Sequence, residues 1–187
     1  MAQAYLNPYL RFWLFWALAF LGFPIGGYLA NVIVGPVTTA LRAGIAGAIV
    51  GAVLGLIQWF VLRAQIPVPF WWIIATSAGM ALGLAISVAF FGSEVSGNSL
   101  LGRAVITGII VGTAQWLVLR QILPQSWIWI VVVALGWGIG WFITRSAGID
   151  LDFKWPVFGA TGALAFQLLT GLALYFLLRS SQGITTE

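Results

Sequence analysis

Three glutamines lie within long apolar stretches of this sequence, and they are its leading candidates for chemistry. Gln58 and Gln115 each close a glycine-rich run, and Gln167 precedes Arg179 by about 12 residues. A carboxamide both donates and accepts hydrogen bonds, whereas hydrocarbon surroundings supply no partner. Each amide therefore needs a partner on a neighbouring segment of the chain or on a ligand. Both interpretations, contacts between helices and contacts with a bound solute, stay open at this point.

Other reactive side chains are scarce. The sequence contains no His and no Cys, so it lacks the usual ligands of zinc, haem, iron–sulfur clusters and copper, as well as the commonest general base. Asp150 and Asp152 have the spacing with which some glycosyltransferases hold a divalent metal, but beside Lys154 they are more typical of a solvated turn. No nucleophile can be paired with a base. We therefore expect no catalytic residue, no metal site and no enzymatic activity.

The composition places these side chains in a membrane. Hydrophobic residues make up 61% of the 187 residues, charged residues make up 6%, and the mean hydropathy is +1.06. A soluble domain has about four times as many charged residues. The net charge of +4 rests on a few Lys and Arg side chains near helix ends, which does not indicate nucleic-acid binding. We expect residues 1–187 to form one transmembrane domain with a polar tail at 180–187.

Apolar runs of about 20 residues, separated by charges and by Pro, Gly or Asn, predict six transmembrane helices. The predicted ranges are 12–33, 42–63, 69–91, 103–121, 127–144 and 156–178. Pro24 lies inside the first of them and removes a backbone hydrogen bond, so a kink is expected there.

The sequence also repeats itself at a shift of about 57 residues. This shift aligns Phe15 with Trp72 and Trp129, and it aligns the pair Gln58-Trp59 with Gln115-Trp116. The third copy is degenerate. The repeat units are 10–66, 67–123 and 124–179. Each unit holds two helices, so all three units have one orientation, and we predict an all-α bundle of three hairpins around a pseudo-threefold axis with both termini on one side.

Glycines recur within the repeat at helical spacing. Gly51 and Gly55 share one narrow helix stripe with Gln58, and the second unit repeats this stripe. Because two backbones approach closely where side chains are missing, we predict that these glycines pack helices against each other. The predicted packing positions are Gly51, Gly55, Gly79, Gly83, Gly108, Gly112, Gly136 and Gly140.

Tryptophans gather toward the end of the bundle that holds the N-terminus. Eight of the eleven are expected there: Trp13, Trp16, Trp59, Trp71, Trp72, Trp116, Trp127 and Trp129. An indole ring suits the boundary between lipid and water, so an interfacial belt is the default interpretation. The alternative is an aromatic-lined pocket in which Trp59 and Trp116 join the glutamines as ligand contacts.

The glycine-rich helix that ends in Gln-Trp-x-Val-Leu-Arg, followed by a Pro turn and a Trp-led helix, resembles uncharacterised multi-hairpin membrane proteins of cyanobacteria and other bacteria. The resemblance covers the second to fifth helices and implies no activity. It implies a prokaryotic inner membrane or a thylakoid. Basic residues are balanced between the two faces, and only the Arg-flanked tight turns and the α-amino group favour cytoplasmic termini.

Two functions are expected from these features. The first is a non-catalytic membrane subunit or scaffold that packs with itself or with a larger complex, contacts membrane lipids, and binds no cofactor other than a lipid or a carotenoid. The second is a small transporter or channel module for a neutral or weakly cationic solute, with Gln58, Gln115 and Gln167 along the path. A cavity that reaches these amides favours the second function, and a dry, glycine-packed centre favours the first.

Overall fold

The computed structural model describes residues 8–93, 97–123, 125–147 and 159–183, and this part of the chain is helical, with turns between the helices. Six of its helical spans are long and apolar enough to cross a membrane. The predicted all-α class is thereby confirmed for the described residues, and six helices are present with the length and composition that a membrane crossing requires. The acidic pair Asp150 and Asp152, with Lys154, falls outside the described residues.

The first span consists of α1 (Pro8–Leu18), a 3₁₀ turn η1 (Ala19–Leu21) and α2 (Gly22–Val34). The other spans are α3 (Ala40–Leu62), α4 (Trp71–Phe91), α5 (Gly97–Leu119), α6 (Ile128–Ser146) and α7 (Ala160–Gly183). The start of α5 differs from the prediction. Arg103 was placed at the helix start but lies inside α5, where it is 7% exposed and donates a hydrogen bond to the Ser93 carbonyl at 3.3 Å.

Local sequence explains several of the helix ends. Thr39 caps α3, because its hydroxyl oxygen accepts a hydrogen bond from the Arg42 backbone N–H at 3.3 Å. Gly35 and Gly92 follow α2 and α4 with φ of +74°, a left-handed conformation that ends a helix at little cost for glycine only. Pro67 lies between α3 and α4, where it prevents the two helices from fusing.

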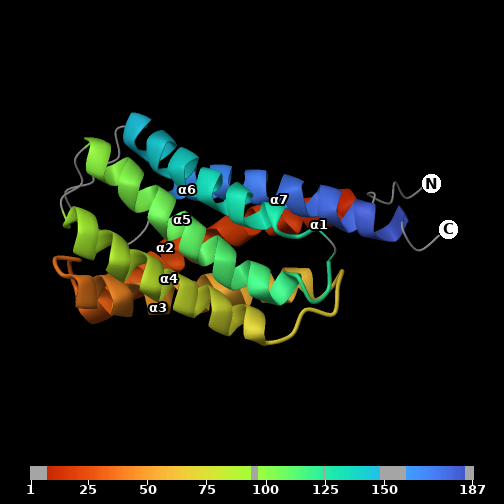
Figure 1. Cartoon of the computed structure of the whole chain (residues 1–187), viewed down its shortest axis with the longest axis horizontal. Coiled ribbons are helices and arrows are strands. Elements are labelled where there is room, and N and C mark those ends of the chain that lie inside the picture. Colours follow the sequence, from red (N-terminus) through yellow and green to blue (C-terminus); the bar gives the residue numbers. More distant parts are fainter. Residues whose placement is uncertain (1–7, 94–96, 124, 148–158, 184–187) are drawn as a thin grey trace, which may run out of the picture.

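The helices form a closed ring in chain order. Each helix from α2 to α6 packs against the next one, and α1 packs against α7 to close the ring (Figure 1). The start of α1, the end of α7 and the α3–α4 and α5–α6 connections lie at the same end of the bundle (Figure 1), which we call the turn end. Side chains of consecutive helices therefore meet in a common centre.

Pro24 accounts for the break in the first span. Its nitrogen carries no hydrogen and cannot donate to the Phe20 carbonyl four residues earlier, and the chain winds as a 3₁₀ turn over Ala19–Leu21. Beyond this turn α2 packs along α3, whereas α1 packs mainly on α7 (Figure 1). The break thus transfers the first span from one neighbour to another. The aligned residues Ala81 and Gly138 leave α4 and α6 unbroken.

Candidate functional site

The three glutamines meet in the centre of the ring. Gln58 on α3, Gln115 on α5 and Gln167 on α7 are between 0% and 2% exposed. Gln115 Nε2 donates a hydrogen bond to Gln58 Oε1 at 3.3 Å, and Gln58 Nε2 donates to Gln167 Oε1 at 3.3 Å. A directional chain of carboxamides therefore joins three helices that are not adjacent in the ring. We call these three residues the glutamine cluster.

The other three spans contribute two indoles and a hydroxyl to the same centre. Trp129 Nε1 on α6 donates to Gln115 Oε1 at 3.0 Å, and Thr76 Oγ1 on α4 accepts from Gln115 Nε2 at 3.0 Å. Trp16 Nε1 on α1 donates to Thr170 Oγ1 at 3.0 Å, and this hydroxyl also lies 3.3 Å from Gln167 Oε1. All six spans thus contribute a polar group to one buried network.

Three buried indoles pack around the network. Trp16, Trp72 and Trp129 are each 0% exposed. The ring centroids of Trp16 and Trp72 each lie 6.2 Å from that of Trp129, at interplanar angles of 72° and 54°. These apolar ring faces lower the local dielectric, which strengthens the hydrogen bonds beside them and makes an unpaired group costly.

Trp129 fixes the orientation of every amide in the cluster. An indole N–H only donates, so the Gln115 atom that faces it must be the oxygen. Gln115 then presents its nitrogen to Gln58, and Gln58 presents its nitrogen to Gln167. The direction of the whole chain of carboxamides follows from one side chain on α6.

The network contains more N–H donors than acceptors. Gln167 Nε2 and Trp72 Nε1 are buried and have no hydrogen-bond partner in the structure. Gln167 Oε1, by contrast, is shared between Gln58 Nε2 and the Thr170 hydroxyl. A centre of this kind can complement an acceptor such as a water or carbonyl oxygen, and it repels a cation.

Trp59 and Trp116 lie at the turn end, as the default interpretation as a belt expects, and not beside the glutamines, as the alternative pocket requires. Trp59 Nε1 donates to the Val68 carbonyl in the α3–α4 connection at 3.2 Å, and the Arg63 guanidinium lies 4.5 Å from its ring centre. Trp116 is partly buried, and the Arg120 guanidinium lies 5.2 Å from its ring centre. Neither indole donates to a carboxamide of the cluster.

The tryptophans do not form one uniform belt. Trp71 and Trp127 are 68% and 60% exposed, as an interfacial belt requires. Trp16, Trp72 and Trp129, which the sequence also assigns to this end, face the centre of the bundle. The interpretation as a belt is therefore wrong for these three residues.

The predicted repeat does not identify Trp16 as a member of the network. The sequence pairs Trp72 and Trp129 with Phe15, but Phe15 is 48% exposed and Trp16 is fully buried. A 3₁₀ turn rises about 2.0 Å per residue and an α-helix about 1.5 Å, so six residues that include η1 rise as far as seven α-helical residues. The residue in register with the two indoles therefore moves from position 15 to position 16.

The glycines of the stripe lie where α3 and α5 approach the helices that follow them. A Cβ atom on Gly51 would stand 2.7 Å from the Ser77 Cα atom and from the Thr76 carbonyl oxygen. A Cβ atom on Gly108 would stand 2.6 Å from the Ala134 Cα atom. Because Gly51 has no side chain, α4 packs closely against α3. This close packing places the Thr76 hydroxyl within hydrogen-bond distance of Gln115.

The other predicted packing glycines have close neighbours as well. For Gly55, Gly79, Gly83, Gly112 and Gly136, the nearest atom to an added Cβ lies at 2.8–3.1 Å and belongs to Thr76, Ala114, Thr107, Ile130 and Phe166, respectively. Gly140 is buried, and its carbonyl group faces Gly162 on α7.

No protein-family model, curated protein or solved structure matches this chain. Within the described residues, no group of three or more His, Cys, Asp or Glu side chains is placed to hold a metal ion. The chemistry of the site is therefore that of neutral amides, hydroxyls and indoles.

Proposed function

We propose that this protein is a non-catalytic membrane subunit or scaffold that packs with copies of itself or with a larger membrane complex and retains lipid or carotenoid. The observation that carries the proposal is the bonding of the glutamine cluster. Gln58 and Gln115 each use both their oxygen and their nitrogen on protein groups. Side chains whose oxygen and nitrogen both bond to other helices hold the helices together. A solute path requires polar groups that are available to the solute.

The outer surface supports the same proposal. Large apolar side chains are exposed along the spans, and Phe90, Phe142 and Trp71 are 78%, 71% and 68% exposed. Such a surface is stable against lipid tails or against other transmembrane helices. The described spans therefore offer apolar contact area to lipid tails or to other transmembrane helices.

We further propose that the chain is built from three hairpin repeats with pseudo-threefold symmetry. The bond between Gln58 and Gln115 supports this, because these residues occupy the same position in the first two units. The third unit departs from the pattern. When Arg179 is aligned with Arg63 and Arg120, Leu174 takes the place of the glutamine, and Gln167 supplies the third carboxamide from a position two turns earlier.

Purification from the native membrane in a mild detergent tests the scaffold. We expect an assembly larger than one copy, with cross-links either between copies or to a defined protein partner, and with lipid or pigment retained. A mock purification from cells without the tagged protein controls for contaminants. A monodisperse monomer with no protein partner and no retained lipid or pigment would refute the proposal.

A small transporter for a neutral solute is the second candidate, and one observation favours it. Gln167 Nε2 and Trp72 Nε1 leave buried donors that an acceptor atom of a passing solute would satisfy. Proteoliposomes that take up water, glycerol or urea faster than empty liposomes, with the gain lost in Gln167→Leu, would support this function. Equal rates in the two preparations would remove it.

A further inference from the structure

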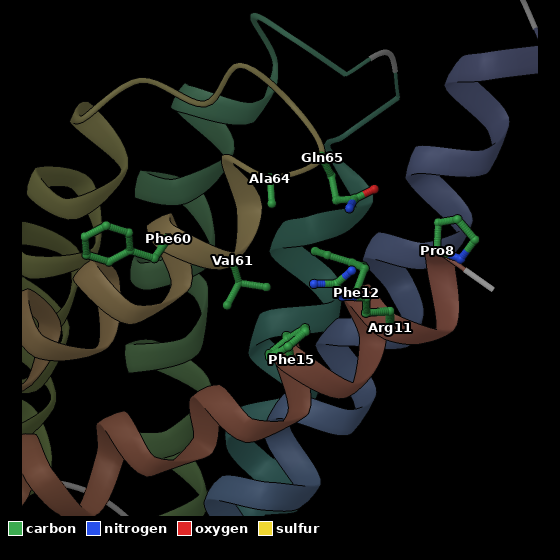
Figure 2. A pocket seen from close by; sticks show the side chains of 8 residues that line it. All are labelled: Pro8, Arg11, Phe12, Phe15, Phe60, Val61, Ala64 and Gln65. Atoms are coloured by element: carbon green, nitrogen blue, oxygen red, sulfur yellow. The ribbon is translucent and has the colours of Figure 1, made fainter. Parts of the chain in front are cut away.

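A cavity of about 700 Å³ opens between α1 and the end of α3 at the turn end (Figure 2). Its volume falls within the range of roughly 300–1,000 Å³ that is usual for small-molecule sites. The lining residues are Pro8, Arg11, Phe12, Phe15, Phe60, Val61, Ala64 and Gln65. The cavity is separate from the glutamine cluster, none of whose residues lines it.

The break in the first span explains why this cavity exists. After η1, α2 packs along α3, but α1 packs mainly on α7. The start of α1 and the end of α3 therefore stand apart at the turn end, and the cavity lies between them (Figure 2). The cavity follows from the proline-dependent winding of a single span.

The walls of the cavity divide into an apolar part and a polar rim. Phe12, Phe15 and Val61 provide rings and a branched aliphatic side chain. Arg11 extends from α1 toward α3, and Gln65 extends from the chain after α3 toward α1, so both polar groups face the same gap (Figure 2). A ligand that fits these walls has a polar head and an apolar tail.

The charge at the rim is positive. Arg11 is the charged residue among those that line the cavity, and its guanidinium lies 5.7 Å from the Phe15 ring centre. Basic pockets between transmembrane helices characteristically bind the head groups of anionic lipids.

We infer that this cavity binds one anionic phospholipid. The Arg11 guanidinium and the Gln65 amide donate to the phosphate, and an acyl chain lies over Phe12, Phe15 and Val61. A guanidinium suits a phosphate because it donates two parallel charged hydrogen bonds. This inference rests on the lipid contact of the proposed function. It specifies where the lipid binds and that its head group is negatively charged.

Native mass spectrometry of delipidated protein in an equimolar mixture of phosphatidylglycerol and phosphatidylcholine tests the site. We expect one phosphatidylglycerol to bind in preference to phosphatidylcholine. Both lipids carry a phosphate, but the choline ammonium cancels its charge, so the preference depends on the positive charge of Arg11. Arg11→Gln should therefore lower the preference about fivefold, the electrostatic attraction of one arginine to anionic lipid. Ala64→Trp should weaken the binding of both lipids by occupying part of the cavity, while Arg120→Gln should bind as the wild type does, since Arg120 lies outside the cavity.

Thermal melting of each variant separates loss of the site from loss of the fold. The inference is overturned if a folded Arg11→Gln keeps the full preference, if a folded Ala64→Trp binds both lipids as the wild type does, or if Arg120→Gln loses the preference equally. Cross-linking separates it from the scaffold. A protein partner without selective lipid binding rejects the lipid site alone, and selective binding by a protein without a partner supports the lipid site while rejecting the assembly.

Discussion

Leucine in place of Gly51 or Gly108 is expected to lower the recovery of natively folded protein severely. At both positions the first added carbon atom would already stand 2.6–2.7 Å from a backbone Cα atom of the neighbouring helix. Backbone cannot move aside as the end of a flexible side chain can, so the helices must separate. We expect a loss of more than about 3 kcal/mol, the upper range for an overpacked core. Thermal melting in detergent and size-exclusion chromatography measure it.

A series of alanine variants makes the same test quantitative and supplies matched controls. Gly51→Ala and Gly108→Ala should melt below the wild type. Gly44→Ala, on the same helix as Gly51, brings its Cβ only to 3.4 Å from the Ala85 Cβ, and Gly138→Ala comes no closer than 3.9 Å to Leu101. These two controls should be neutral or gain up to about 1 kcal/mol of helix propensity.

An exposed leucine controls for the added bulk. Ala52 is exposed on α3 beside Gly51, and leucine is welcome at a lipid-facing position, so Ala52→Leu should melt like the wild type. If Gly51→Leu also melts like the wild type, the stripe does not hold α3 against α4. The basis for linking the glycines to the position of Thr76 would then be removed.

The sequence was sufficient to predict the helical class and the six spans because both depend on length and composition. A bilayer accepts about 20 consecutive apolar residues as a helix and little else, so hydropathy identifies each span without knowledge of its neighbours. The predicted start of α5 is wrong because Arg103, as a charged residue before an apolar run, is typical of the end of a loop. Its side chain instead donates to the Ser93 carbonyl and lies inside the helix.

The candidate site could be predicted only in part. Gln58, Gln115 and Gln167 were singled out because a carboxamide in hydrocarbon must find a partner. Trp16 was missed because the repeat was aligned at a constant shift, and the 3₁₀ turn before Pro24 changes the register by one residue. The signal that could have revealed this was Pro24 itself, which was recognised as a kink but not as a change of register.

The direction of each tryptophan could not be deduced from its depth. Trp71 and Trp72 are neighbours in sequence, yet Trp71 is 68% exposed and Trp72 is fully buried, because successive helical residues differ by about 100° around the axis. A membrane interface and a bundle interior both accept indoles. Only the packing of α4 against its neighbours decides which of the two receives the ring.

Methionine in place of Gln115 is expected to have the largest effect of any substitution in the glutamine cluster. Gln115 bonds to Gln58, Thr76 and Trp129 at once. Its loss leaves Gln58 Oε1 and Trp129 Nε1 buried without this partner. Each unpaired group costs about 1–3 kcal/mol of folding free energy in a soluble protein, and the average for interhelical bonds in membranes is smaller. We expect a total loss of about 2 kcal/mol or more, measured by reversible unfolding in mixed micelles.

Gln167→Met and Gln121→Met are the comparisons for this variant. Gln167→Met also strands one donor, Gln58 Nε2, but it removes the unpartnered Gln167 Nε2, so its cost should be smaller by about 1 kcal/mol. Gln121 is exposed and bonds only within its own helix region, so Gln121→Met should be neutral. Equal losses at Gln115 and Gln167 would contradict the assigned direction of the amides.

A double-mutant cycle isolates the bond that orients the cluster. Trp129→Phe keeps the buried ring but removes the N–H that points at Gln115 Oε1. If this bond sets the direction of the amides, Gln115→Met combined with Trp129→Phe should cost less than the two single losses together, by about 1 kcal/mol, since neither partner is then left unpaired. Strictly additive losses would mean that Trp129 packs beside the cluster without orienting it, and the direction of the carboxamide chain would need another cause.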